Sequence, residues 1–249
     1  MSRFFIEVAY KGTNYAGFQI QKNANSIQAE IQKALKIFFK EDIELTCSSR
    51  TDSGVHADSN FFHFDSDSGL NAITHDKLDI SSYNINAILP DDIVVKRIFA
   101  VKDDFHSRFD AISREYQYNI YTQKDPFLAD RAYYYPYKLN IDEMNKAAAL
   151  LLKYTDFMCF SKKNTQVKTF NCTIIESIWT FENSRYVYTV KANRFLRGMV
   201  RALVATMLRV GTGKLSLQEF IEIIEKKDAT KADFSAPPQG LFLKKVNFI

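Results

Sequence analysis

The octet that begins at Ser49, which reads Ser-Arg-Thr-Asp-Ser-Gly-Val-His, is the segment of this 249-residue chain best suited to chemistry. Its Asp52 lies between an arginine and a glycine, just after the strand-like run 43–47. Residues two apart in an extended run point the same way, so Arg50 and Asp52 would share a side, and the guanidinium would keep the carboxylate ionised. Gly54 would let the chain turn sharply. The octet fits a nucleophilic carboxylate, although an Asp-Ser-Gly run alone also fits a plain turn.

The elements that must position this octet predict an α+β chain. Strands are expected at 4–10, 43–47, 60–65, 93–99, 115–121, 174–180 and 186–192. Helices are expected at 27–38 after a Ser26 cap, around 75–83, at 142–154 after an Asp142 cap, at 194–210, and after the capping box at 216–219. Two successive strand-and-helix sets indicate duplicated units that share a central, mostly antiparallel sheet with helices on one face. The boundary is placed so that the halves are 1–102 and 103–249.

The charge distribution favours a polyanionic partner. The formal net charge is only +4, but the stretch from Lys191 to Lys214 holds six basic residues and no acidic one. A second unopposed basic stretch carries Lys162, Lys163 and Lys168. Such surface is the electrostatic footprint of a protein that contacts phosphates, and a solvated surface stretch is the alternative.

Two further groups of side chains are placed by periodicity. At about 100° per residue, Arg194, Arg197 and Arg201 fall in one stripe of the expected helix 194–210, which could face a groove. In the expected strand 115–121, Tyr116 and Tyr118 share a side, and core packing is the usual fate of such tyrosines.

Several function classes are excluded by what the sequence lacks. Three cysteines at irregular spacing indicate neither a disulfide framework nor a zinc ligand set. The sequence shows no signal peptide and no apolar run long enough to span a bilayer, so we expect a soluble, cytoplasmic protein. The run 211–214, Gly-Thr-Gly-Lys, resembles part of a phosphate loop, but Leu208 and Leu215 replace residues that this motif needs. Nucleotide hydrolysis is therefore rejected.

The octet resembles the Gly-Arg-Thr-Asp-Ala-Gly-Val-His signature of the bacterial tRNA pseudouridine synthase A family, with Ser49 and Ser53 replacing a glycine and an alanine. Further motifs follow the family order along nearly the whole chain. They are the opening segment 10–19 with Phe18 in place of tryptophan, Asp-Phe-His-Ser-Arg-Phe at 104–109, Arg-Glu-Tyr-Gln-Tyr at 114–118, Met-Val-Arg at 199–201 and Gly-Leu-Phe-Leu at 240–243.

This resemblance implies an enzyme that isomerises uridine to pseudouridine in the anticodon stem-loop of tRNA, at tRNA positions 38 to 40. It implies two related, ferredoxin-like halves with a cleft between them, the first carrying the catalytic aspartate and the second the substrate tyrosine and the basic helix. It also implies a homodimer on which one tRNA crosses both subunits. The reaction involves no redox change and no external group transfer, so neither a cofactor nor a metal is expected.

The resemblance also implies roles for individual residues. Asp52 is the expected nucleophile, and whether it attacks the sugar or abstracts a sugar proton is open. Tyr116 would lie against the target base, and Arg201 would pair with Asp52. Arg50 would either pair with Asp52 or fill the space that the flipped base leaves.

Arg194 and Arg197 are expected to contact phosphates, with a solvated face as the competing interpretation.

Two alternative functions use the same residues differently. A non-catalytic RNA-binding module would use this basic surface and the tyrosines without needing Asp52. A metal-independent hydrolase would use Asp52 as a covalent nucleophile on a small substrate and would not need the basic stretches.

Overall fold

The computed structural model describes residues 2–66, 82–162 and 167–248, which form two compact units. The N-terminal unit comprises Met1–Ile112 together with Leu243–Ile249, and the C-terminal unit comprises Ser113–Phe242. The units thus divide after Ile112, whereas the sequence placed the boundary of the halves after residue 102, and the end of the chain returns to the first unit. In the described part of the chain, no helix has the length and apolar character needed to cross a membrane.

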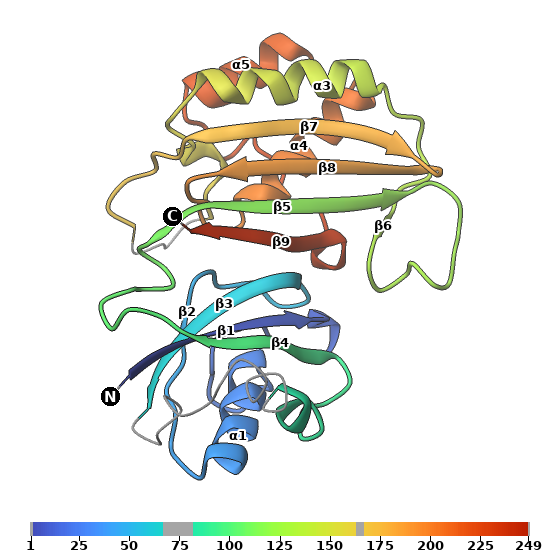
Figure 1. Cartoon of the computed structure of the whole chain (residues 1–249). Helices are drawn as coiled ribbons and strands as arrows, with labels where there is room; N and C mark the ends of the chain where they lie inside the picture. Colours follow the sequence, from blue (N-terminus) through green and yellow to red (C-terminus); the bar gives the residue numbers. More distant parts are fainter. Residues whose placement is uncertain (1, 67–81, 163–166, 249) are drawn as a thin grey trace. The chain divides into compact units, whose positions relative to one another are not determined.

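The N-terminal unit is built on an antiparallel sheet (Figure 1). Strand β1 (Ser2–Tyr10) lies between β3 (His56–Ser66) and β4 (Ile93–Ala100), and the short β2 (Thr46–Cys47) pairs with β3. Helix α1 (Ile27–Phe39) follows β1 and buries the side chains of Ile27, Ile31, Ala34 and Leu35, as its periodicity predicts. The Ser26 hydroxyl accepts a hydrogen bond from the Ala29 amide at 3.3 Å, which confirms the predicted cap.

Both faces of this sheet are apolar, because consecutive phenylalanines on β1 point to opposite sides. On one face Phe4 stacks on Phe64 at 5.6 Å, and Phe64 also meets Phe39 at the end of α1. On the other face Phe5 is 1 % exposed and touches five rings. Those rings belong to Phe61, His63, Phe99, Phe105 and Phe248. Phe248, in β9 (Leu241–Phe248), therefore gives the end of the chain a place in the first core.

The long strands of the C-terminal unit also pair in antiparallel fashion. Strand β8 (Arg185–Ala192) lies between β5 (Ala111–Tyr121) and β7 (Ile174–Glu182), and β6 (Tyr133–Tyr134) pairs in parallel with the end of β5. The helices of this unit are α3 (Ile141–Leu150), α4 (Met199–Gly211) and α5 (Leu217–Glu225). Short 3-10 helices of this unit occupy Leu151–Lys153, Met158–Phe160 and Pro238–Gly240, and one in the N-terminal unit occupies Gly12–Asn14.

The order of elements repeats between the units. The first runs β1-α1-β2-β3, with β3 between β1 and β2, and the second runs β5-α3-β7-β8, with β8 between β5 and β7. Every one of these pairings is antiparallel. The predicted mixture of helices with mostly antiparallel sheet is therefore confirmed.

Several predicted elements differ in extent from those in the structure, and two of them show why. The strand expected at 43–47 shrinks to two residues because side chains of α1 occupy its carbonyls: Gln32 donates to the Ile43 oxygen at 3.0 Å and Gln28 to the Leu45 oxygen at 3.2 Å. The helix expected at 142–154 begins earlier, because the Asn140 side chain rather than Asp142 caps it. The helix expected around 75–83 lies largely outside the described residues.

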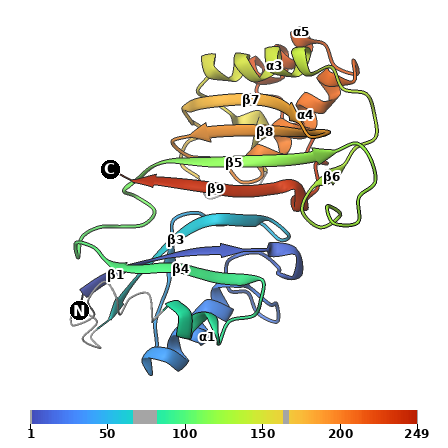
Figure 2. The ribbon, with the colours of Figure 1, turned by 45° about the vertical axis from the view of Figure 1, so that its right-hand side comes forward.

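In each unit, one asparagine side chain hydrogen-bonds the backbone amide and carbonyl of a residue on the outermost strand. The Asn86 amide donates to the Val95 carbonyl of β4 at 2.9 Å, and its oxygen accepts from the Val95 amide at 2.7 Å. Asn145 on α3 bonds both backbone groups of Trp179 on β7 in the same way, at 2.9 and 2.8 Å. Figures 1 and 2 show α3 running beside β7. At Val95 and Trp179 the backbone groups are thereby occupied and are not open to pairing with a further strand.

We expect Asn86→Asp to lower the free energy of unfolding by about 2 kcal/mol, because a carboxylate cannot donate to the Val95 carbonyl and places negative charge against it. The matched control is Asn84→Asp, which adds the same charge at an exposed position two residues away and should change stability by less than about 0.5 kcal/mol. Urea denaturation measures both. Equal losses in the two variants would show that charge, and not the strand edge, sets the effect.

Candidate active site

The Asp52 loop, residues 48–55, connects β2 to β3 in the N-terminal unit. Its turn is closed by a hydrogen bond from the Val55 amide to the Asp52 carbonyl at 3.1 Å. Gly54 adopts φ +77°, a left-handed conformation that glycine reaches without strain. The sharp turn predicted after Asp52 is therefore present.

Buried polar groups fix the first half of this loop. The Tyr10 hydroxyl lies 2.8 Å from the Thr51 hydroxyl and accepts a hydrogen bond from the Asn60 amide at 3.1 Å. Asn60 also donates to the Ser49 carbonyl at 2.8 Å. All four side chains are buried. Because unmade hydrogen bonds in such a place are costly, these contacts hold the backbone on the N-terminal side of Asp52 in one position.

The opening segment of the chain fixes the second half. The Phe18 amide donates to the Thr51 carbonyl at 3.1 Å, and the Ser53 hydroxyl donates to the Tyr15 carbonyl at 3.1 Å. The Gly12 amide donates to Nδ1 of buried His56 at 3.0 Å. A Cβ atom at Gly12 would lie 2.0 Å from the Val55 oxygen, so only glycine permits this approach.

Asp92 fixes the opening segment in turn. Its carbonyl accepts from the Lys11 amide at 2.9 Å, and its carboxylate accepts from the Tyr15 hydroxyl at 2.5 Å. Burial and the neighbouring Asp92 carboxylate both raise the pKa of Tyr15, so this phenol stays protonated as a donor. The sequence drew attention to the segment 10–19 but not to Tyr10, Asn60 or Asp92 as supports of the loop.

The Asp52 side chain contrasts with its surroundings. It is partly exposed, while Thr51 and Val55 beside it are buried, and no hydrogen bond or ion pair engages its carboxylate among the described residues. The backbone is therefore fixed while both carboxylate oxygens stay available. This arrangement suits a nucleophile or a general base.

Arg50 is exposed, and no ion pair in the described part of the chain joins it to Asp52. Its charge acts instead on Cys47: burial raises the pKa of this thiol, and the positive charges of Arg50 and Arg108 oppose that shift. Two roles were expected for Arg50, and the structure shows no contact for one of them, the pairing with Asp52.

Tyr116 lies on β5 opposite Val190 of β8, and its ring meets Phe195 edge-on at 5.1 Å. Its exposed fraction is 8 %. Tyr118 on the same side is fully buried, and its hydroxyl donates to the Pro237 carbonyl at 2.7 Å, in agreement with its predicted core position.

Arg201 and Arg209 are the two partly exposed residues of α4, whose other residues are buried. The residues from Ala202 to Leu208 are all buried, whereas Arg201 is partly exposed and donates from Nε to the Ala236 carbonyl at 2.6 Å. This bond orients the guanidinium and leaves its two terminal nitrogens for other partners.

The predicted helical stripe that joined Arg194, Arg197 and Arg201 is wrong. Helix α4 begins at Met199 after Gly198, whose φ of +75° ends the preceding turn. Asn193 holds the chain in a non-helical path, because its amide and side chain bond Thr173 at 3.1 and 2.8 Å. Arg194 and Arg197 therefore lie in the connection between β8 and α4, where Arg194 is partly exposed and Arg197 is exposed.

The two basic stretches meet in this connection. The Lys162 amide donates to the Arg197 carbonyl at 3.0 Å. The Lys162 side chain packs over Gly198, where a Cβ atom would lie 3.0 Å from Lys162 Cγ. Lys163 lies outside the described residues. Lys162 and Arg197, far apart in sequence, thus lie next to one another in the C-terminal unit, and neighbouring cations of this kind suit phosphate contacts.

Comparisons with known proteins place this sequence in a family. Residues 147–248 match the family model described as tRNA pseudouridine synthase. The chain is 45 % identical to tRNA pseudouridine synthase A of Bacteroides thetaiotaomicron over 100 % of its own length and 91 % of that protein. It is 44 % identical to the protein of that name from Porphyromonas gingivalis, over 99 % and 97 % of the two chains, and 36 % identical to that from Staphylococcus aureus, over 98 % and 91 %. With such identity along its whole length, the chain belongs to the tRNA pseudouridine synthase A family.

Proposed function

We propose that this protein isomerises uridine to pseudouridine in the anticodon stem-loop of tRNA, at tRNA positions 38 to 40, with Asp52 as the nucleophile and without a cofactor. Membership of the family supports the reaction class. The observation that carries the catalytic assignment is the Asp52 carboxylate itself, which is partly exposed and without a partner among the described residues, on a loop fixed from both sides.

The chemistry asks little beyond one well-placed carboxylate. The bond between uracil N1 and ribose C1′ breaks, the base turns over, and a bond forms between C5 and C1′. The C5 hydrogen leaves as a proton and N1 gains one, so neither electrons nor external groups are exchanged. Asp52 either attacks C1′ to hold the sugar as an ester or removes a sugar proton, and both routes use a free carboxylate oxygen.

The remaining residues serve to hold and orient the RNA. We assign Tyr116 to the target base, through its ring face and hydroxyl, and Arg201 to the Asp52 charge. Arg50 takes the position of the flipped base, because Asp52 is not its partner among the described residues. Arg194 and Arg197 contact phosphates, an assignment supported by their exposure and by the junction with Lys162.

The proposal extends to architecture and assembly. Related ferredoxin-like halves are supported by the repeated order of strand, helix and two strands in the two units. A cytoplasmic homodimer that binds one tRNA across both subunits follows from the resemblance. Sedimentation of the protein with and without tRNA tests the dimer, and a monomer under both conditions would contradict it.

Asp52→Asn should abolish release of tritium from tRNA labelled at uracil C5, by more than about a thousandfold, because rejoining at C5 expels that hydrogen and the amide is a poor nucleophile. Affinity for tRNA should change by less than about twofold, since the side chain keeps its shape. The control is Asp91→Asn, which removes an exposed charge elsewhere in the unit. If folded wild-type protein binds tRNA and releases no tritium from any unmodified tRNA, it is a binding module and not an isomerase.

Arg201→Ala should lower kcat by about a hundredfold and leave tRNA affinity within about threefold, because it acts on charge in the transition state. Arg197→Ala is the contrasting variant and should raise Kd by about fivefold with kcat at saturation unchanged. Single-turnover tritium release and filter binding separate the two quantities. Equal losses in both for Arg201→Ala would make this residue an ordinary phosphate contact.

Tyr10→Phe should lower kcat by about tenfold without changing tRNA affinity, because it removes the hydroxyl that positions Thr51 next to Asp52. Tyr188→Phe is matched to it, since Tyr188 is equally buried and its hydroxyl lies 2.8 Å from that of Ser177 in the other unit. Both variants lose a buried hydrogen bond, and only Tyr10→Phe should lose turnover. A similar loss of turnover in both would mean that general destabilisation explains the effect.

A further inference from the structure

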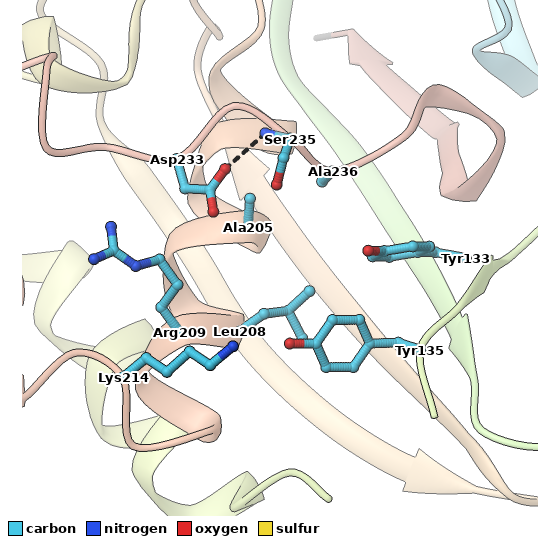
Figure 3. Close-up of a pocket in the computed structure, with 9 residues that line it drawn as sticks. All are labelled: Tyr133, Tyr135, Ala205, Leu208, Arg209, Lys214, Asp233, Ser235 and Ala236. Carbon is cyan, nitrogen blue, oxygen red and sulfur yellow. Dashed lines mark hydrogen bonds between the residues drawn. The ribbon is translucent and has the colours of Figure 1, made fainter. Parts of the chain in front are cut away.

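A polar pocket lies in the C-terminal unit, where Ala205, Leu208 and Arg209 of α4 form part of its wall (Figure 3). Its volume is about 240 Å³, and its wall includes Ala236, whose carbonyl accepts the hydrogen bond from Arg201. Strand β6 and the residues after it supply Tyr133 and Tyr135 to the opposite wall. None of the roles proposed above uses this pocket.

One side of the pocket is cationic. The Lys214 side chain lies across it, with its ammonium turned toward the Tyr135 hydroxyl in Figure 3, and the same ammonium lies 5.9 Å from the ring centroid of Tyr137. Lys214 forms no ion pair with a carboxylate in the described part of the chain. Arg209 lies at the rim, where Nη1 donates to the Lys231 carbonyl at 3.1 Å. These groups and the tyrosine hydroxyls are donors suited to a phosphate.

The other side of the pocket carries acceptors. Two hydrogen bonds hold Asp233. Its backbone amide donates to the Thr206 hydroxyl at 3.0 Å, and its Oδ1 accepts from the Ser235 amide at 2.8 Å. Asp233 and Ser235 both line the pocket, and the second carboxylate oxygen of Asp233 points away from the Ser235 amide in Figure 3. A carboxylate here would repel a bare anion, but it suits a ligand that brings a hydroxyl donor to this side and its negative charge to the other.

We propose that this pocket binds one ribonucleotide unit through its phosphate and its ribose 2′-hydroxyl. The phosphate takes Lys214 with the hydroxyls of Tyr133 and Tyr135, and the 2′-hydroxyl donates to Asp233. The pocket is smaller than the 300–1,000 Å³ range of sites for whole cofactors, and this fits a sugar and its phosphate. The 2′-hydroxyl is the group by which a protein distinguishes RNA from DNA.

The source of this nucleotide is the RNA substrate, an assignment that rests on the proposed function. Lys214 belongs to the basic stretch that begins at Lys191, and Arg201, one helical turn before the pocket residue Ala205, bonds the carbonyl of Ala236 in the pocket wall. The Gly-Thr-Gly-Lys run that resembled a phosphate loop thus contributes to phosphate binding through its lysine side chain, and not through a nucleotide-hydrolysing loop.

The first arm of the test measures binding of an unmodified tRNA transcript by fluorescence anisotropy over a range of salt concentrations. Lys214→Gln should raise Kd by about five- to tenfold at moderate salt and reduce the slope of log K against log salt by about one. Lys231→Gln is the matched control, because it removes an exposed lysine near the pocket that does not line it. Circular dichroism and thermal unfolding confirm that the variants are folded.

The second arm uses uridine monophosphate and its 2′-deoxy counterpart as small probes, with titration followed by NMR. Wild-type protein should bind the ribonucleotide more tightly, and Asp233→Asn should reduce that preference while preserving the bond to the Ser235 amide. If Lys214→Gln weakens the small probe but not tRNA, the ligand chemistry holds and its source is a free nucleotide. If Lys214→Gln behaves as Lys231→Gln toward both ligands, or if both probes bind alike, the proposal is overturned.

The outcome does not depend on turnover. Wild-type protein that binds tRNA but releases no tritium would defeat the proposed isomerase, whereas the pocket is judged by affinity, salt slope and the preference for ribose alone.

Discussion

The site depends on a buried polar junction in which the Tyr10 hydroxyl bonds Thr51 and Asn60 beneath the Asp52 loop. Irregular backbone usually lies at the surface, because its amides and carbonyls need partners. Here β1 and β3 supply those partners from their own side chains. A reactive loop thereby acquires the rigidity of the sheet on which it rests, and catalytic groups require such support to stay within a fraction of an ångström of their working position.

The same junction explains how a carboxylate can be fixed without being occupied. An ion pair with Arg50 would position Asp52, but it would also engage the carboxylate oxygens that the chemistry needs. In the structure the positioning contacts go to the backbone and to the neighbours Thr51 and Ser53, while the Asp52 oxygens have no partner among the described residues. Positioning and reactivity are therefore assigned to different residues.

Sequence periodicity correctly predicted the elements that are determined by their local sequence pattern. Strand β1, helix α1 with its Ser26 cap, and the capping box of Ser216 with Glu219 are all confirmed. The errors arose where distant side chains compete for the backbone. Asn193 bonds Thr173 and so delays α4.

The supports of the Asp52 loop were hidden for the same reason. Tyr10 and Asn60 look like ordinary strand residues in sequence, because their partners lie tens of positions away and only the pairing of β1 with β3 brings them together. Family motifs located the reactive residue, but they did not reveal what holds it. The division of the chain was likewise obscured by β9, because the contact of Phe248 with Phe5 and Phe61 joins opposite ends of the sequence.

Comparison of the corresponding hairpins shows why the Asp52 loop needs such support. In the C-terminal unit, β7 and β8 are joined by Asn183 and Ser184 alone, both at positive φ, as in the tight turns that fix hairpin register unaided. In the N-terminal unit the equivalent connection between β2 and β3 is opened into residues 48–55. A longer connection loses that intrinsic definition and exposes more backbone, so the contacts from Tyr10, Gly12 and Phe18 replace what the tight turn would have provided. The opening segment of the chain is therefore part of the candidate active site, even though none of these three contacts involves the Asp52 carboxylate.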